Sequence, residues 1–597
     1  GLAPLPARGS FLDDLIFSGT LEHSRAALEC FVAAARDAGL ELNVAKCEVI
    51  CSDAAAATAA FPGMRVLSPS AWTLLGIPCG DRDHAESFVS EALKRGAAKM
   101  HSLASLADTH VGFTLVRYCA SYPLAVFYAR AAGPLPSLSV FDAALQEAAS
   151  TLLGPLSPKQ WDQTVLPCRL GGLGLRTSSE HAAIAFVAAS AASAKLLPLF
   201  LAPAALAALP DTDPWLAPAL ACPHLRRSPL AAEKAAEYLR SGSAKFGDGA
   251  QKDMSALIDA TRHAGLLAGA SQATLARLQS CAAPFSGIWI APMASALGPP
   301  PTFFTPSRFS ALIRLRLGAA VLPAPSPCVL CGNGLIADVM GAHSLCCLGK
   351  GLRARLHNAA RTAIFKLASR AMTAPALEAP VGGVTSALRV DVLLRDNCAP
   401  FRGIATDVTI VYPLQRSLIA PAAAKPGGAA TAAEAGKRAK YGAACAAANF
   451  KFVPIVMDMF GAWGASATPF LRMLAKRDLS PGEAVPIAMR VIGTILAGHI
   501  AEILTANAAA ADVAANTASD RAADLVLVRS AHDADAADID DEEQGDPVAE
   551  EDLLASLPSS LVASSAPFPA SAATADSDTD EEEVPASSAA AGVPHSG

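Results

Sequence analysis

The chain has 597 residues, enough for several domains with hydrophobic cores of their own. Its 52% hydrophobic content owes much to alanine, and the longest apolar stretch, residues 181–210, is interrupted by Lys195, Pro198 and Pro203, which argues against a membrane protein. The net charge of −7 is unevenly distributed, because residues 531–597 hold 17 acidic side chains and no Lys or Arg. Residues 1–530 therefore carry a charge of +10, from 47 Lys and Arg against 37 Asp and Glu, which suits a polyanionic partner.

The cysteine pattern and the first residues indicate the compartment. No signal peptide opens the chain, and the 14 cysteines are scattered except between Cys328 and Cys347, so we expect a reducing, intracellular location. The chain begins at Gly1 rather than at a methionine, and we expect it to be part of a longer reading frame.

The first candidate site is an aspartate pair. Residues Phe11–Phe17 predict two short strands that flank Asp13 and Asp14, so that a tight hairpin presents both carboxylates at its tip, where they can hold a divalent metal. A helix that ends at Gly39 and a strand over Leu40–Val44 are predicted to follow. The alternative for the aspartate pair is an ordinary turn.

The motifs of the first 180 residues resemble one polymerase family. Phe11–Asp14, then Gly39 and Leu40 with Lys46, then Leu74–Pro78 resemble the end of a reverse transcriptase palm. The resemblance continues into the thumb of non-LTR retrotransposon polymerases through Leu115–Cys119, Phe141 with Asp142, and Leu166–Leu175. It implies that Asp13 and Asp14 are catalytic magnesium ligands, that Lys46 contacts nucleic acid and that the template is RNA. In that family an earlier strand supplies a third aspartate, so we expect the polymerase half to be inactive in this chain.

Residues 200–327 alternate Pro-rich breaks with Ala-rich helical stretches and predict a helical linker. Within it, Arg314 and Arg316 are candidates to bind a nucleic-acid backbone. The competing interpretation is a solvated face near a helix end.

A cysteine and histidine cluster predicts a structural zinc site. Cys328, Cys331, His343 and Cys347 offer three thiolates and one imidazole, the donors that four-coordinate zinc prefers. Cys346 remains an alternative to Cys347, and a chance grouping is the alternative to a site.

The next stretch predicts an amphipathic helix, with an apolar stripe that includes Leu356 and Ala360. Arg355, His357 and Asn358 are candidates to contact phosphates from another side of this helix, and a solvated basic face is the alternative.

Two strands are predicted to bring a pair of aspartates together. Residues 388–395 and 403–411 alternate as strands, and a loop centred on residue 399 places Asp391 opposite Asp407. Facing carboxylates on apolar strands suggest a hard divalent cation such as Mg²⁺. A one-residue slip in register would instead place the two side chains on opposite faces.

A basic helix face follows these strands. Glu434, Lys437, Lys440 and Tyr441 share one face, and Lys437 or Lys440 is a candidate to support the scissile phosphate. An exposed Glu and Lys stripe is equally compatible with the pattern. Glu378 is a candidate further metal ligand.

Together these residues resemble the zinc knuckle and restriction-like endonuclease of site-specific non-LTR retrotransposons. The resemblance rests on the Cys and His cluster, on Arg355–Asn358, on Asp391 and Asp407, and on Lys437 or Lys440. It implies a PD-(D/E)xK nuclease that nicks target DNA so that the free 3′ hydroxyl primes reverse transcription. Val390 replaces the usual proline and Thr409 the usual lysine, so the lysine role passes to Lys437 or Lys440.

The sequence thus predicts a multidomain α+β fragment of a reverse transcriptase and endonuclease that binds target DNA and element RNA in the nucleus, with Zn²⁺ and Mg²⁺ and no small-molecule cofactor. The alternative is a non-catalytic, zinc-dependent nucleic-acid-binding remnant. The expected parts are the palm end (1–95), a helical thumb (96–200), the linker (201–327), the zinc knuckle (328–350), the nuclease (351–480), an Ala-rich helix (481–530) and a disordered acidic tail (531–597).

Overall fold

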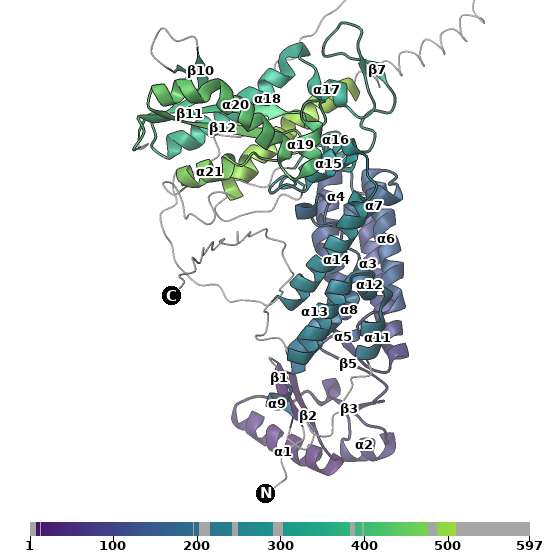
Figure 1. Ribbon diagram of the computed structural model, residues 1–597. Helices are drawn as coiled ribbons and strands as arrows, with labels where there is room; N and C mark the ends of the chain where they lie inside the picture. Colours follow the sequence, from purple (N-terminus) through teal and green to yellow (C-terminus); the bar gives the residue numbers. More distant parts are fainter. Residues whose placement is uncertain are drawn as a thin grey trace, which may run out of the picture. The chain divides into compact units, whose positions relative to one another are not determined.

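The computed structural model describes residues 7–11, 14–194, 196–201, 215–241, 249–290, 303–381, 388–396, 399–475 and 486–508. The architecture is mixed α+β, predominantly helical with small sheets (Figure 1). The expected α+β class is therefore confirmed. Asp13 and the acidic segment 531–597 lie outside the described residues.

The chain begins with the expected hairpin. Strands β1 (Ala7–Phe11) and β2 (Asp14–Ser18) pair antiparallel, with Phe11 opposite Asp14, so the tip falls at residues 12 and 13. Helix α1 (Leu21–Asp37) follows, and the Thr20 side chain caps it by accepting a hydrogen bond from the His23 N–H.

The strand predicted over Leu40–Val44 is wrong. The Leu40 N–H bonds to the Ala35 carbonyl, which closes the end of α1 after Gly39 turns the backbone to a φ of 76°. The chain then makes a short 3₁₀ turn, η1 (Val44–Lys46), and the strand comes later as β3 (Glu48–Ile50). The alternating apolar pattern failed because Leu40 is taken up by the helix cap.

Two further small sheets complete this region. Strand β3 pairs in parallel with β4 (Arg65–Leu67) after helix α2 (Ala54–Ala60). Strands β5 (Ala71–Leu74) and β6 (Ile77–Gly80) form a hairpin. Its two turn residues, Leu75 and Gly76, both have positive φ values of 50° and 78°, the turn that matches the twist of paired strands.

A helical bundle occupies the region predicted as a thumb. Its core contains the fully buried Met100, Phe113, Phe141 and Leu145. Asp142 accepts hydrogen bonds from the N–H groups of Ser178 and Ser179 and so fixes the start of the last long helix. The elements are α3 (Arg82–Ala104), α4 (Thr109–Leu115), the π-helical turn η2 (Val116–Ala120), α5 (Tyr122–Ala132), α6 (Pro136–Leu153), α7 (Pro158–Val165), η3 (Cys168–Leu170), α8 (Ser178–Ala194) and α9 (Leu197–Phe200).

The region predicted as a linker is helical, and much of it packs on the bundle. A second core joins Ile184 and Val187 of α8 to Leu225, Met254 and Ile258. Residues 215–267 therefore extend the bundle, which the sequence pattern did not reveal. The elements are α11 (Leu216–Ala221), α12 (Pro223–Arg226), α13 (Pro229–Ser241), α14 (Ala250–Leu267), α15 (Gln272–Cys281) and α16 (Pro306–Leu317).

His110 is a buried histidine that joins the bundle to this second region. Its Nε2 lies 2.9 Å from the Ile290 carbonyl oxygen, and the Phe304 N–H donates to its Nδ1 at 3.0 Å. The ring stacks on Phe309 with 4.1 Å between centroids. Burial lowers its pKa from 6.5 to about 4, so the imidazole is neutral, with Nε2 protonated.

We expect His110 to make the protein less stable in mild acid. Because its folded pKa of about 4 lies below its ordinary value of 6.5, the unfolded chain binds more protons between these pH values. The stability is complete above pH 6.5 and is lost as the pH falls toward 4, by up to about 3 kcal/mol. Urea denaturation at pH 7.5 and 4.5 should show a smaller loss in His110→Asn than in wild type. An equal loss in both would contradict this role, and His101→Asn, at an exposed site, is the control.

The C-terminal part contains a four-stranded sheet in the order β12-β11-β10-β9, in which β11 and β12 are parallel and the other neighbours antiparallel. Leu356 and Ile364 of α18 share a core with Val392 and Leu394, whereas Tyr441 of α20 packs in a separate cluster with Leu393 and Ala405. The alternation of β10 thus faces two different helices. The elements are α18 (Leu352–Arg370), β9 (Ala376–Pro380), β10 (Arg389–Leu394), β11 (Gly403–Val411), α19 (Ile419–Ala424), α20 (Gly428–Ala447), β12 (Phe450–Asp458) and α21 (Ala467–Ala475).

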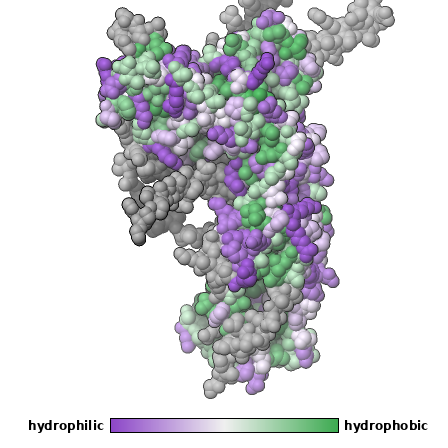
Figure 2. All heavy atoms as spheres, viewed as in Figure 1, coloured by the Kyte–Doolittle hydropathy of each residue, from purple (hydrophilic) through white to green (hydrophobic). Residues whose placement is uncertain are grey.

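One more helix, Pro486–Ala508, lies within the predicted Ala-rich segment. Among the described residues it alone has the length and apolarity of a membrane span, which is weak support for one because buried core helices meet the same criteria. Met489, Ile492 and Leu496 are buried in the same core as α16 and α18. On the face in Figure 2, hydrophilic and hydrophobic side chains are interspersed over the helices.

Candidate metal centre and carboxylate site

Four candidate zinc ligands converge in one cluster. The ligand atoms of Cys328, Cys331, His343 and Cys347 all lie within 4.8 Å of one another, so the cluster could hold a metal ion such as zinc. Cys328 Sγ lies 3.9 Å from Cys347 Sγ, and Cys331 Sγ lies 3.7 Å from His343 Nε2. Cys346 is exposed and outside the cluster, so the structure selects Cys347 as the fourth ligand.

Short local elements hold these ligands. Strands β7 (Ser326–Pro327) and β8 (Ile336–Ala337) pair antiparallel, and Gly332 and Gly334 between them have φ values of 65° and 76°. The Asp338 carboxylate accepts hydrogen bonds from three N–H groups, including that of His343 at 2.7 Å, and so fixes the start of α17 (Ala342–Cys346). The 3₁₀ turn η4 (Gly349–Gly351) then leads to α18.

The cluster also favours deprotonation of one thiol. Burial opposes charge on Cys328, but N–H groups of Cys331 and Leu330 and the Asn507 amide outweigh it and lower its pKa. Burial and the neighbouring Cys328 raise the pKa of Cys347. A bound cation would displace the remaining protons, because thiolates are the metal ligands.

The two predicted aspartates of the sheet face each other in register. The β10 and β11 pairs Val392 with Thr406 and Leu393 with Ala405 continue to Asp391 opposite Asp407. This is the register that a loop centred on residue 399 predicts. Both carboxylates are largely buried, with side-chain exposures of 12% and 8%.

His357 of α18 holds Asp391. Its Nε2 lies 3.3 Å from Asp391 Oδ2 and 3.0 Å from the Val408 carbonyl oxygen, and the same Asp391 oxygen accepts the Val408 N–H at 2.7 Å. The bond to Asp391 raises the pKa of His357. Burial alone would raise the pKa of Asp391, but the bonds from His357 and Val408 lower it. The structure therefore places His357 beside a carboxylate, whereas the sequence suggested phosphate contact.

The two candidate lysines of α20 have different surroundings. Lys437 Nζ lies 2.7 Å from Asp407 Oδ2, which also accepts the Thr409 hydroxyl at 3.1 Å. Lys440 is exposed, donates to the Tyr441 hydroxyl at 3.0 Å and lies over that ring. Lys437 therefore belongs to the carboxylate site, and Lys440 flanks it.

The other acidic candidates have structural partners. Glu378 lies across from Asp391 in the β9 to β10 register, but its carboxylate pairs with Arg361. Glu434 is buried and accepts bonds from the N–H and hydroxyl of Ser466. Among the described residues, the cysteine and histidine cluster is the one group of three or more metal-type ligands in close proximity.

The remaining sequence candidates are dispersed. Asp14 opens β2 and Lys46 ends η1 with an exposed side chain. Arg355 pairs with Glu502, and Asn358 is exposed beside His357.

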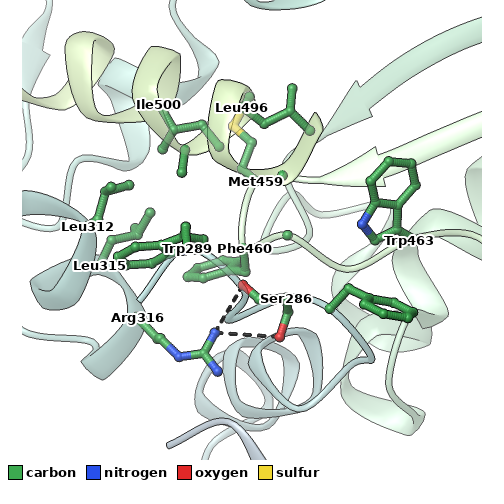
Figure 3. A pocket seen from close by; sticks show the side chains of 14 residues that line it. Ser286, Trp289, Leu312, Leu315, Arg316, Met459, Phe460, Trp463, Leu496 and Ile500 are labelled. Carbon is green, nitrogen blue, oxygen red and sulfur yellow. Dashed lines mark hydrogen bonds between the residues drawn. The ribbon is translucent and has the colours of Figure 1, made fainter. Parts of the chain in front are cut away.

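The assignment of Arg316 to nucleic-acid binding is wrong. Its side chain is buried, and its guanidinium donates to the carbonyl oxygens of Gly172, Cys168, Cys281 and Ser286 at 2.9–3.4 Å. Figure 3 shows Arg316 bonded to Ser286 beside an apolar pocket lined by residues such as Trp289 and Leu496. All these carbonyls come from distant segments, which is why the pattern around Arg316 did not predict its burial.

Arg316→Met is expected to lower the free energy of unfolding by about 2–4 kcal/mol, because several buried carbonyls lose their donor. Arg314→Met should cost less than about 1 kcal/mol, since Arg314 has one carbonyl contact in an exposed setting, to Ala320 at 3.0 Å. Urea denaturation followed by circular dichroism measures both. Equal losses in the two variants would contradict the structural role of Arg316.

Comparisons with known proteins leave the family open. The chain matches no protein-family model, and no curated protein resembles it significantly in sequence.

Proposed function

We propose that residues 351–475 form a magnesium-dependent endonuclease that nicks duplex DNA, in a reverse transcriptase and endonuclease of the non-LTR retrotransposon type. The observation that carries the proposal is the meeting of Asp391, Asp407 and Lys437 from β10, β11 and α20. Two facing carboxylates with a lysine at 2.7 Å combine a cation site with a positive charge for phosphate.

The donor set suits Mg²⁺. This ion usually takes one or two protein carboxylates and completes its shell with waters and phosphate oxygens. Among the described residues, the hydrogen bonds and ion pairs of Asp391 and Asp407 fall on their Oδ2 atoms, to His357, Val408, Lys437 and Thr409. These contacts fix both carboxylate groups and leave each Oδ1 for the ion.

The residues would divide the chemistry as follows. When bound, Mg²⁺ supplies an activated water and charge stabilisation for the leaving oxygen. Water adds to phosphorus and the bond to the 3′ oxygen breaks, leaving a 5′ phosphate and a 3′ hydroxyl. Lys437 offsets charge on the phosphate, and His357 keeps Asp391 ionised and oriented. The cysteine and histidine cluster has a structural role beside this site.

The proposal extends to the rest of the chain through its motif order. The hairpin that ends at Asp14, the β5 to β6 turn and the helical bundle support a palm end and thumb that act on element RNA. Several exposed basic side chains around the sheet, Lys366, Arg395, Arg402, Lys440 and Lys451, suit a DNA backbone, and action on chromosomal DNA requires a nuclear location.

The test is nicking of supercoiled plasmid by the full chain, loaded with zinc and assayed with and without Mg²⁺. The full chain is needed because the helix Pro486–Ala508 contributes to the same core as α18. We expect nicking that requires Mg²⁺ and falls at least about 10³-fold in Asp391→Asn and Asp407→Asn, because either change removes a ligand charge.

The alternative, a non-catalytic nucleic-acid-binding protein, predicts another result. It would bind DNA with an affinity that depends on zinc but is the same with or without Mg²⁺ and in Asp407→Asn. Folded, zinc-loaded wild type that cuts no faster than the two variants would favour it.

A further inference from the structure

One amide from the C-terminal helix reaches the metal centre. Asn507 lies near the end of the helix Pro486–Ala508, is 1% exposed and comes from a segment more than 150 residues after the ligands. Its Oδ1 accepts the Val329 N–H at 2.9 Å. Its Nδ2 donates to the Ser344 hydroxyl at 2.8 Å and lies 3.7 Å from Cys328 Sγ, within range of an N–H···S bond.

These three contacts use both ends of the amide. An asparagine has one carbonyl oxygen and two N–H donors, and here each has a partner. Val329 follows Cys328, and Ser344 follows His343, so one side chain ties the loop that carries the first ligand to the helix that carries the third. The donor to Cys328 also stabilises a thiolate.

The rest of the helix is fixed to the same region. Leu504 lies against Gly341, where an added Cβ would come within 2.7 Å of Leu504 Cδ2, and Glu502 pairs with Arg355 of α18. One or two turns earlier, Leu496 and Ile500 line the apolar pocket of Figure 3 together with Met459. The position of Asn507 is therefore set by contacts along the helix.

We propose that Asn507 is a positioning residue of the metal centre, and that metal binding and docking of the helix Pro486–Ala508 are energetically coupled. Second-shell donors orient metal ligands and tune their charge, and their loss typically lowers metal affinity about 10–100-fold. The inference rests on the cysteine and histidine cluster and is independent of the proposed nuclease.

The test titrates the metal-free full chain with Co²⁺, whose thiolate charge-transfer absorption reports coordination, and then displaces it with Zn²⁺. Asn507→Ala should bind about 10–100-fold more weakly than wild type. Asn507→Asp keeps the acceptor for Val329 but cannot donate to Cys328, and should also bind at least about tenfold more weakly. Thr505→Ala is the matched control, because its hydroxyl bonds only to carbonyls of its own helix.

Reciprocity supplies a second readout. If zinc binding and helix docking are linked, zinc should slow amide hydrogen exchange in residues 496–508 of wild type, and less so in Asn507→Ala. Wild-type affinity in either Asn507 variant, or exchange in the helix that is indifferent to zinc, would overturn the proposal. A wild-type chain that binds no Co²⁺ would overturn the metal centre itself, whatever the plasmid assay shows.

Discussion

Cys347→Ser should abolish stoichiometric zinc binding, whereas Cys346→Ser should retain it. Cys347 Sγ belongs to the four-ligand cluster, while the adjacent Cys346 thiol is exposed. A structural zinc centre contributes about 10–16 kcal/mol of apparent binding free energy, and a serine hydroxyl is a poor substitute for a thiolate. We therefore expect residues 328–347 to lose their fold in the Cys347 variant.

The measurement is zinc content of the purified full chain, together with hydrogen exchange across residues 328–347. The expected results are one zinc per chain for wild type and Cys346→Ser and close to none for Cys347→Ser, with fast exchange in that segment. Zinc retained by Cys347→Ser but lost from Cys346→Ser would show that the neighbouring thiol is the ligand.

The facing aspartates could be predicted because antiparallel pairing obeys simple arithmetic. Two strands joined by a loop centred on residue 399 must place residue 391 opposite 407, and the observed pair of Val392 with Thr406 has the same centre. The zinc ligands could be predicted for a similar reason, since Cys328 to Cys347 span only 20 residues. In both cases the decisive geometry is local in sequence.

The interpretations that failed depend on distant partners or on competing local structure. Arg316 resembles a surface arginine until the carbonyls of Cys168, Gly172 and Cys281 surround it. Asn507 belongs to an Ala-rich stretch without any motif, so nothing in its neighbourhood indicates a contact with Cys328. Leu40 alternates as in a strand but caps α1. Sequence periodicity reports which face is apolar, and does not report which distant segment covers it.

The difference between Lys437 and Lys440 gives the sharpest functional prediction. The two are three positions apart on α20, so helical spacing places both on one side and does not distinguish them. The structure does, because Lys437 Nζ is 2.7 Å from Asp407 Oδ2 whereas Lys440 contacts Tyr441. A lysine beside the metal-binding carboxylate can stabilise charge that develops on the phosphate, and loss of one such group typically costs about 10²–10³-fold in rate.

Lys437→Met should therefore lower the Mg²⁺-dependent nicking rate about 10²–10³-fold, and Lys440→Met less than about tenfold. Single-turnover rates at saturating protein separate the chemical step from DNA binding. Lys440 is exposed and suits a phosphate contact away from the reacting bond, so its loss should mainly weaken binding and reduce its dependence on salt. If Lys440→Met showed the larger fall in single-turnover rate, the ion pair of Lys437 with Asp407 would be a structural contact, and the catalytic lysine would be Lys440.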